Sequence, residues 1–398
     1  MWDAEAMSDP VETSMMQIAV TEDDVFVRSQ RVSVLPPPLI ETGPIGWLRA
    51  NLFSSPFNAI LTVAVVAFLA WAVPPLVRFL FIDATWTGAD REACLAGPHG
   101  EAGACWAFVR DRLSYFIYGS YPIASRWRVD LFFAMLAFGI GWLLWLDAPR
   151  RLLGALYFFV IMPIVAYVLL NGWSLIGLPI VDTALWGGVL VTVVVTTVGI
   201  VASLPLGIVL ALGRRSSLPA VRVLSTMFIE FVRGVPLITV LFMASVMLPL
   251  FVPPAWSPDK LLRALVGIVL FSSAYMAEVI RAGLVAVPLG QYEAARALGL
   301  RFWRMQGLII LPQALRITLP NIVNSFIALF KDTTLVFFVG IFDLLKTVEV
   351  ARVDPKWATP VTSATGYAFA AMFYFVFCFL MARYADRIEY RLARAERR

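Results

Sequence analysis

Few residues of this 398-residue chain are of the types that carry out catalysis. The chain has one histidine, His99, and three cysteines, Cys94, Cys105 and Cys378. An enzyme site needs a nucleophile, a base or metal ligands that converge on one cavity, and no such set clusters in the sequence. One histidine with two cysteines nearby is also poor material for a zinc site. We therefore expect neither catalytic residues nor a bound metal.

A different kind of chemistry is indicated by a charged stretch between two apolar segments, "QYEAARALGLRFWRMQGLIILP" at 291–312. Pro288, just before it, can begin a helix because the N–H that proline lacks would be unbonded there. Good helix formers follow, and Gly299 can adopt the left-handed conformation that ends a helix. The pattern predicts a helix pair over 288–306, two short helices that meet at an angle. One face is expected to be apolar and the other to carry Glu293, Arg296, Arg301 and Arg304.

The rest of the chain is strongly apolar, since 60% of its residues are hydrophobic and 15% are charged, with a mean hydropathy of +0.80. A soluble protein of this size could not bury so much apolar surface, so lipid is the solvent for most of the chain. The apolar runs are continuous rather than alternating, which favours helices over a barrel. We predict an all-α integral membrane protein with about eight transmembrane helices, seven or nine being the alternatives. The predicted spans are 57–82, 130–147, 152–170, 184–212, 222–251, 263–283, 307–330 and 366–384.

The net charge of +5 comes largely from arginines beside apolar runs and in the tail, which is not the pattern of a nucleic-acid surface. By the positive-inside rule the basic tail 387–398 is cytoplasmic, and an even number of spans places the N-terminal arm 1–56 there too. Residues 57–182 then form three spans with an external loop at 83–129. Residues 183–386 form five spans with a cytoplasmic loop at 284–306. Arginines in the external loop count against this topology: Arg91, Arg110, Arg112, Arg126 and Arg128.

The external loop also contains Cys94 and Cys105. If this loop faces an oxidising compartment, the two cysteines predict a disulfide, and two free thiols are the alternative. Cys378 lies in the last span, where it is expected to be a small buried apolar residue.

Charged and small residues inside the spans predict contacts between helices. Two acid–arginine pairs, each three residues apart, are expected to form structural ion pairs: Glu230 with Arg233, and Glu278 with Arg281. Pro236 is expected to kink the fifth span. Glycines of the fourth span permit close helix approach, within this chain or to another subunit: Gly187, Gly188, Gly199 and Gly207.

The helix pair could dock in a groove of a partner or merely lie on the membrane surface, and its periodicity does not choose between the two. Its residues, however, resemble a known signature. Glu293-Ala294-Ala295, then Gly299, then Ile309-x-Leu311-Pro312 are similar to the EAA signature of ABC-importer membrane subunits. Residues 184–398 resemble the polar amino acid permeases. The segments "FDLL" (342–345) and "WATP" (357–360), with the extra N-terminal spans, resemble the long permeases of the general L-amino acid type.

This resemblance implies the core of a type I ABC importer permease in the bacterial inner membrane, moving L-amino acids by alternating access. It implies four partners: a cytoplasmic ABC ATPase dimer, a second and related permease as in a heterodimer, a periplasmic amino acid binding protein and the lipid bilayer. ATP and Mg²⁺ would bind the ATPase, and the chain itself contains no Gly-Lys dipeptide for a phosphate loop. An ion-gradient-driven secondary transporter is the alternative. The coupling loop would comprise Glu293, Ala294, Ala295, Arg296, Gly299, Leu311 and Pro312.

A substrate path is suggested by the seventh span, which Pro320 is expected to interrupt. The free N–H groups of a broken helix could receive a carboxylate, and Asp332 could receive the ammonium group of an amino acid. Ser325 stands where some short permeases have a glutamate, so their cationic-substrate site does not transfer directly. The alternative is that these polar groups bond neighbouring helices. The candidate residues are Asn321, Asn324, Ser325, Asp332 and Thr333.

Overall fold

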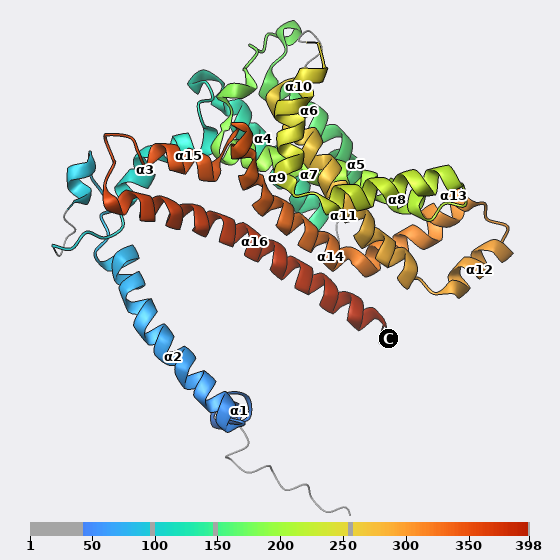
Figure 1. Cartoon of the computed structure of the whole chain (residues 1–398), viewed down its shortest axis with the longest axis horizontal. Helices are drawn as coiled ribbons and strands as arrows, with labels where there is room; N and C mark the ends of the chain where they lie inside the picture. Colours follow the sequence, from blue (N-terminus) through green and yellow to red (C-terminus); the bar gives the residue numbers. More distant parts are fainter. Residues whose placement is uncertain (1–42, 96–99, 146–149, 254–257, 397–398) are drawn as a thin grey trace, which may run out of the picture. The chain divides into compact units, whose positions relative to one another are not determined.

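The computed structural model of the chain describes residues 43–95, 100–145, 150–253 and 258–396, and these ranges are mostly helical (Figure 1). The N-terminal arm up to residue 42, His99 and residues 397–398 of the tail lie outside the described residues. The chain divides into two units, Met1–Pro74 and Pro75–Arg398.

The first unit contains α1 (Gly43–Asn51) and most of α2 (Pro56–Val77). At the start of α2 the Ser55 hydroxyl accepts the N–H of Asn58 at 3.1 Å, which satisfies one of the free N–H groups of the first turn. No residue of α2 is buried, although the helix is apolar on every side. A helix of this kind needs lipid or other helices around it, so α2 fits the first predicted span.

Within the described residues, seven helical segments are long and apolar enough to cross a membrane, and a bent pair of helices makes an eighth. The predicted all-α membrane fold with about eight spans is confirmed. The last helix is longer than predicted, because α16 (Pro360–Glu396) continues through Arg387 and Arg391 of the predicted tail. The segments are Pro56–Ile82, Ile123–Leu144, Leu152–Asn171, Gly188–Arg214, Pro219–Gly234 with Leu237–Phe251, Lys260–Ala286, Phe302–Val339 and Pro360–Arg391.

The elements of the second unit follow one another with short connections. The π-helical segments are η2 (Arg78–Ile82), η5 (Tyr157–Ile161), η8 (Met243–Met247) and η10 (Gln306–Ile310). The 3-10 turns are η3 (Arg91–Cys94), η4 (Ile123–Ser125), η6 (Ser174–Ile176), η7 (Thr183–Leu185) and η11 (Thr333–Val339), and the short strand is β1 (Phe342–Asp343). The remaining helices are α3 (Trp106–Tyr118), α4 (Arg126–Leu144), α5 (Arg151–Leu156), α6 (Met162–Asn171), α7 (Gly188–Arg214), α8 (Pro219–Gly234), α9 (Leu237–Phe242), α10 (Leu248–Phe251), α11 (Lys260–Ala286), α12 (Leu289–Ala297), α13 (Phe302–Met305), α14 (Leu311–Asp332) and α15 (Leu344–Ala351).

The centre of this unit is formed by α7, α11 and α14, which pack on one another. The glycines of α7 make this packing close. A Cβ on Gly207 would lie 2.7 Å from Cγ of Met276 in α11, and one on Gly199 would lie 2.7 Å from Cδ2 of Leu329 in α14. These two glycines therefore serve helix approach within the chain, which was one of the two predicted possibilities.

The fifth predicted span is bent by 105° between α8 and α9. Val235 lies at the break in an extended conformation, with φ −110° and ψ 135°, because the residue before a proline avoids the helical region. Pro236 therefore does more than kink this span: α8 and α9 run in different directions on its two sides.

The predicted external loop 83–129 is largely structured. It contains η3, α3 and η4, and it ends before α4, which begins at Arg126. The Arg128 side chain is 2% exposed and donates to the carbonyl of Pro179 at 2.9 Å. The predicted boundary at 129 was wrong, because α4 begins at Arg126 and a buried arginine that donates to a carbonyl can lie inside a helix.

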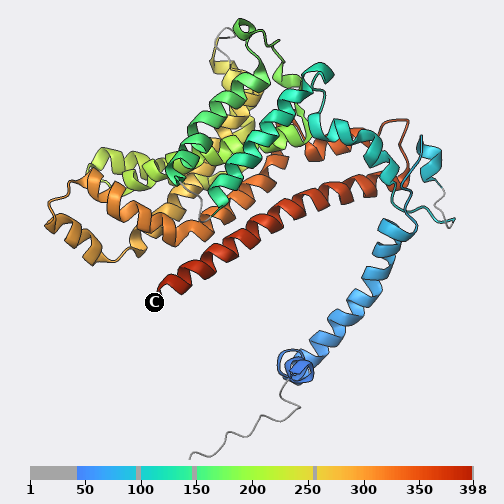
Figure 2. The ribbon, with the colours of Figure 1, turned by 180° about the vertical axis from the view of Figure 1, so that it is seen from behind.

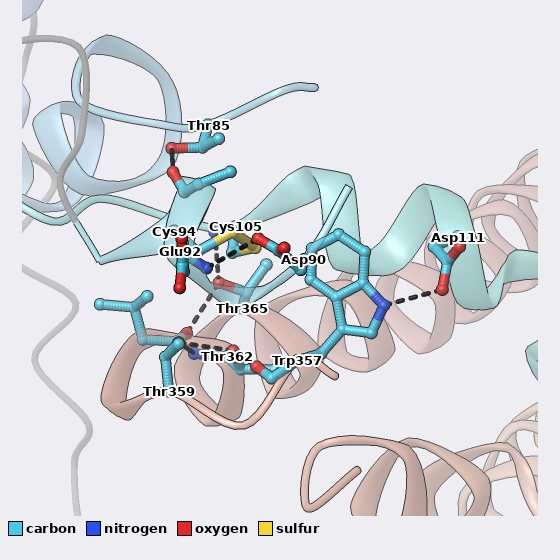
Figure 3. Close-up of a disulfide and its surroundings, with 12 residues drawn as sticks. Thr85, Asp90, Glu92, Cys94, Cys105, Asp111, Trp357, Thr359, Thr362 and Thr365 are labelled. Atoms are coloured by element: carbon cyan, nitrogen blue, oxygen red, sulfur yellow. Dashed lines mark hydrogen bonds between the residues drawn. A yellow bond between two sulfur atoms is a disulfide. The ribbon is translucent and has the colours of Figure 1, made fainter. Parts of the chain in front are cut away.

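Residues 83–95, 100–125 and 340–359, here called the cap, pack together over the start of α16. Cys94 and Cys105 form the predicted disulfide, and the N–H of Cys105 donates to the Thr365 hydroxyl at 2.8 Å (Figure 3). The buried Trp357 donates its ring N–H to Asp111 at 2.7 Å. Burial alone would raise the pKa of the Asp111 carboxyl, but the hydrogen bonds from Trp357 and Lys356 hold it below its ordinary value.

The cap and the helix pair lie at opposite ends of the second unit, as the two views from front and back agree (Figures 1 and 2). At the cap end, backbone bridges join Gly119 to Trp186 and Gly187 to Phe342. Loops that precede α4, α7 and α16 thus meet at one end, which is what alternating spans require.

Candidate functional site

The helix pair forms as predicted, as α12 and α13 joined at Gly299. Gly299 has φ +70°, and its N–H donates to the carbonyl of Arg296 at 2.9 Å. The N–H of Leu300 donates to the carbonyl of Ala295 at 3.2 Å. These two bonds are the Schellman arrangement that ends a helix, and they fix the angle between α12 and α13.

The inner face of the helix pair is seated in a hydrophobic cluster with the ends of α7, α8, α11 and α14. Tyr292, Ala295 and Met305 are its buried members from the helix pair. The outer face differs from the prediction, because it mixes charged and apolar groups. Glu293, Ala294 and Arg296 are exposed there. Large apolar side chains are exposed too: Leu289 at 75%, Leu298 at 76% and Trp303 at 74%.

Leu311 and Pro312 begin α14, which continues directly from α13 through η10. Pro312 has no N–H to donate to the carbonyl four residues earlier, and a π-helical turn at this point accommodates the missing bond. The EAA-like residues are therefore divided among several places. Glu293 and Ala294 lie on the outer face of α12 and Ala295 lies on its inner face, while Gly299 forms the turn and Leu311 and Pro312 begin α14.

A pocket of 240 Å³, here called the serine pocket, lies between α7, α11 and α14. Its polar lining comes from Ser203, Ser272, Ser325 and Asp332, with the aromatic ring of Tyr275 beside them. The Ser203 hydroxyl is buried and has no hydrogen-bond partner among the described residues. The Ser325 hydroxyl donates to the carbonyl of Asn321 at 2.9 Å. The pocket thus offers one carboxylate and several hydroxyls to a small polar molecule.

The predicted substrate path is only partly brought together. Ser325 and Asp332 line the serine pocket, but Asn321 and Asn324 are exposed and do not line it. Thr333 is buried and donates its hydroxyl to the carbonyl of Phe330 at 2.8 Å. The sequence analysis missed Ser203, Ser272 and Tyr275, for which the available signal was a polar side chain within an apolar span.

The predicted break at Pro320 was wrong. α14 runs without interruption from Leu311 to Asp332, with Pro320 inside it. A proline removes only its own N–H, and the surrounding helices hold the segment helical on both sides of it. No free N–H groups are therefore created at Pro320 for a substrate carboxylate.

The predicted ion pairs are rearranged around Arg214, a residue that the sequence analysis did not single out. Arg281 pairs with Glu278 at 2.9 Å, as predicted. Glu230, in contrast, pairs with Arg214 at 2.8 Å, and Arg214 also binds Glu278 at 2.5 Å. The predicted pair of Glu230 with Arg233 was wrong, because Arg214 at the end of α7 lies between the two carboxylates.

Arg233 instead lies over the ring of Tyr275, with 5.4 Å from the guanidinium carbon to the ring centroid. Spacing of three residues along a helix permits an ion pair but does not decide which partner is nearest.

The helix pair and the serine pocket lie in a part of the chain that matches a known protein family. Residues 203–394, which contain both, match the family "Binding-protein-dependent transport system inner membrane component". The chain is 49% identical over 345 residues to the inner membrane amino-acid ABC transporter permease protein YhdY of Escherichia coli (strain K12), covering 87% of this chain and 92% of YhdY. This chain is a member of the amino-acid ABC transporter permease family.

A second relative extends the likeness of the permease over its N-terminal part. The glutamate/glutamine/aspartate/asparagine transport system permease protein BztC of Rhodobacter capsulatus is 40% identical over 440 residues, covering 94% of the permease and all of BztC. A solved amino acid ABC transporter with histidines aligns with 51% of the permease and 92% of its own chain, at 29% identity and a TM-score of 0.45. The permease is a transport subunit rather than an enzyme, and its family does not favour the ion-gradient-driven alternative.

Proposed function

We propose that the permease is the translocating subunit of an inner-membrane importer that carries L-amino acids by alternating access, driven by a separate ATPase. The observation that carries this proposal is the exposed outer face of the helix pair, in a family whose members are ABC transporter permeases. YhdY is an amino-acid transporter permease by name, and the name of BztC specifies glutamate, glutamine, aspartate and asparagine.

The outer face of the helix pair is suited to a protein partner. Glu293 and Arg296 supply charges that can fix the register of a bound groove, and Leu298 and Trp303 supply apolar area that water would otherwise solvate. The partner in this proposal is a cytoplasmic ATPase dimer that holds ATP and Mg²⁺. The helix pair and the C-terminus of the permease then lie on the cytoplasmic side, and the cap faces the periplasm.

The serine pocket is suited to an amino acid on its way through the membrane. Asp332 can accept the ammonium group, and the hydroxyls of Ser203, Ser272 and Ser325 can bond the carboxylate or a polar side chain. A periplasmic amino acid binding protein would deliver the substrate to the cap end. A second, related permease would complete the path on the other side.

The experiment that tests this function uses the transporter copurified in mild detergent and reconstituted in proteoliposomes. We expect amino acid uptake that requires ATP. We also expect Glu293→Lys to reduce ATPase association and uptake by about tenfold or more, because it reverses a charge at the docking face. Glu389→Lys, at an exposed acid on α16, is the matched control and should transport normally. Uptake without nucleotide, or normal uptake by Glu293→Lys, would contradict the proposal.

A further inference from the structure

The last turn of α11 contains a backbone carbonyl that the helix itself cannot satisfy. The carbonyl of Leu284 would normally accept the N–H of residue 288, four positions later. Residue 288 is proline and has no N–H, and Leu284 is buried, so its carbonyl needs a donor from elsewhere. Pro288, at the start of the helix pair, thus leaves the Leu284 carbonyl without its usual helical donor at the end of α11.

Two side chains from different elements donate to this carbonyl. The Tyr292 hydroxyl of α12 donates to it at 2.8 Å, and the Arg215 guanidinium, which follows the end of α7, donates at 2.8 Å. Arg215 also donates to the Tyr292 hydroxyl at 3.1 Å, and its guanidinium lies 5.6 Å from the centroid of the Tyr292 ring. Arg215, Tyr292 and the Leu284 carbonyl therefore form one contact, here called the clamp, that joins α7, α11 and α12.

Arg214, the residue before Arg215, strengthens the junction between α7 and its neighbouring helices. Arg214 bonds Glu278 of α11 and Glu230 of α8, so two consecutive arginines at the end of α7 hold it to three other helices. The two helices that the clamp joins to α12 are also two walls of the serine pocket. Ser203 lies three turns before Arg214 on α7, and Tyr275 lies one turn before Glu278 on α11.

We infer that Arg215 and Tyr292 are positioning residues that hold α12 rigidly to α7 and α11, so that displacement of the helix pair by the ATPase changes the shape of the serine pocket. This inference rests on the proposed function. Apolar contacts of Tyr292 and Ala295 already seat the helix pair, but they are not directional, whereas the hydrogen bonds of the clamp fix its orientation. A displacement of α12 would thus be transmitted to α7 and α11 through the rigid clamp rather than through a flexible joint.

The clamp can be weakened without leaving the Leu284 carbonyl unpaired. Tyr292→Phe keeps the ring and removes the hydroxyl, while Arg215 still donates. Arg215→Met keeps the length of the side chain and removes its donors, while Tyr292 still donates. Each single variant should therefore fold and insert, and the double variant removes both donors. Arg222→Met, at an exposed arginine of α8, is the matched control.

The first measurement is amino acid uptake per ATP hydrolysed by the reconstituted complex. We expect the double variant to lower this ratio roughly fivefold or more while ATPase binding and basal hydrolysis persist. We expect the ratio to recover in part when Arg215 is replaced by lysine instead of methionine, because lysine restores a donor and a positive charge. A wild-type ratio in the double variant would overturn the inference, and so would a proportional loss of uptake and hydrolysis, which would make the clamp merely structural.

The second measurement does not depend on transport. Spin labels at the exposed positions Leu289 of α12 and Val209 of α7, in a Cys378→Ser background, report the distance between the two helices. We expect a narrow distance distribution that the double variant broadens and Arg222→Met does not. An unchanged distance distribution in the double variant would overturn the inference that the clamp holds α12 rigidly, even if transport is ATP-driven. Absence of ATP-driven uptake in the wild type would instead refute the proposed function.

Discussion

At the scale of single residues, the serine pocket depends on Asp332. This residue supplies the carboxylate of the pocket, whose other polar groups are the hydroxyls of Ser203, Ser272, Ser325 and the phenol of Tyr275. With serine rather than glutamate at 325, Asp332 is the one acid among the described residues that line the pocket. Under the proposed function it would neutralise the substrate ammonium group. A hydroxyl can serve either as donor or as acceptor, so these serines can adapt to different side chains.

We predict that Asp332→Asn lowers amino acid uptake by the reconstituted transporter. Loss of a hydrogen bond to a charged group costs about 1.5–3 kcal/mol, or roughly ten- to hundredfold in uptake at low substrate concentration. Basal ATP hydrolysis should persist because the helix pair is not altered. Lys331→Gln, at the exposed neighbouring residue, is the control. Unchanged uptake in Asp332→Asn would remove this residue from the path.

At the scale of elements, α15 shows how a short helix is held at the cap end of α7. Asp343 is fully buried before α15 and accepts the N–H groups of Leu345 and Lys346 at 3.2 and 3.0 Å. The Thr347 hydroxyl donates to the carbonyl of Asp343, and it accepts the N–H of Gly188 at the start of α7. Burial raises the pKa of the Asp343 carboxyl from 3.8 to about 6, although its hydrogen bonds act in the opposite direction.

This raised pKa predicts a pH-dependent stability. The folded protein binds the proton of Asp343 more tightly than the unfolded chain, so its contribution is full below about pH 4 and is lost as pH rises through about 6. Relative to Asp343→Asn, which does not titrate, the wild type should lose about 2 kcal/mol between pH 4.5 and pH 7. Thermal unfolding of the full chain in detergent, from pH 4.5 to 7, measures this difference.

Asp90→Asn is the control for that series, because Asp90 caps η3 through the N–H of Glu92 at 3.0 Å but is exposed to water. A pH-independent difference between Asp343→Asn and the wild type would show that burial does not disfavour the Asp343 carboxylate.

At the scale of the whole molecule, the second unit is organised between two ends with different construction. The helix-pair end is held by ion pairs, the clamp and an apolar cluster. The cap end is held by the disulfide, by Trp357 bonded to Asp111 and by Arg112 paired with Asp354 at 2.5 Å. Because the cap joins segments far apart in the chain, it keeps the starts of α7 and α16 together.

We predict that breaking the disulfide destabilises the cap. Closing a loop between cysteines 11 residues apart constrains the unfolded chain and is worth about 2–4 kcal/mol. Replacement of Cys94 and Cys105 by serine should lower the thermal unfolding midpoint, and reductant should have no further effect on that variant. Cys378→Ser should leave the reductant response of the wild type intact. A midpoint insensitive to both reductant and the double replacement would contradict this role.

The amino-acid sequence alone determined the features that depend on neighbouring residues. Apolar runs of membrane-spanning length predicted the helices, Gly299 predicted the turn within the helix pair, and two cysteines in one loop predicted the disulfide. Each signal is local, because helix length and a left-handed turn are set by residues close in the chain.

Only the tertiary structure decided which distant groups meet. It brought Ser203, Ser272 and Ser325 from three helices to one pocket, and it placed Arg214 between Glu230 and Glu278. It also kept α14 continuous through Pro320. The physical reason is that an ion pair or a pocket depends on how helices pack, and sequence spacing restricts only the partners available within one helix.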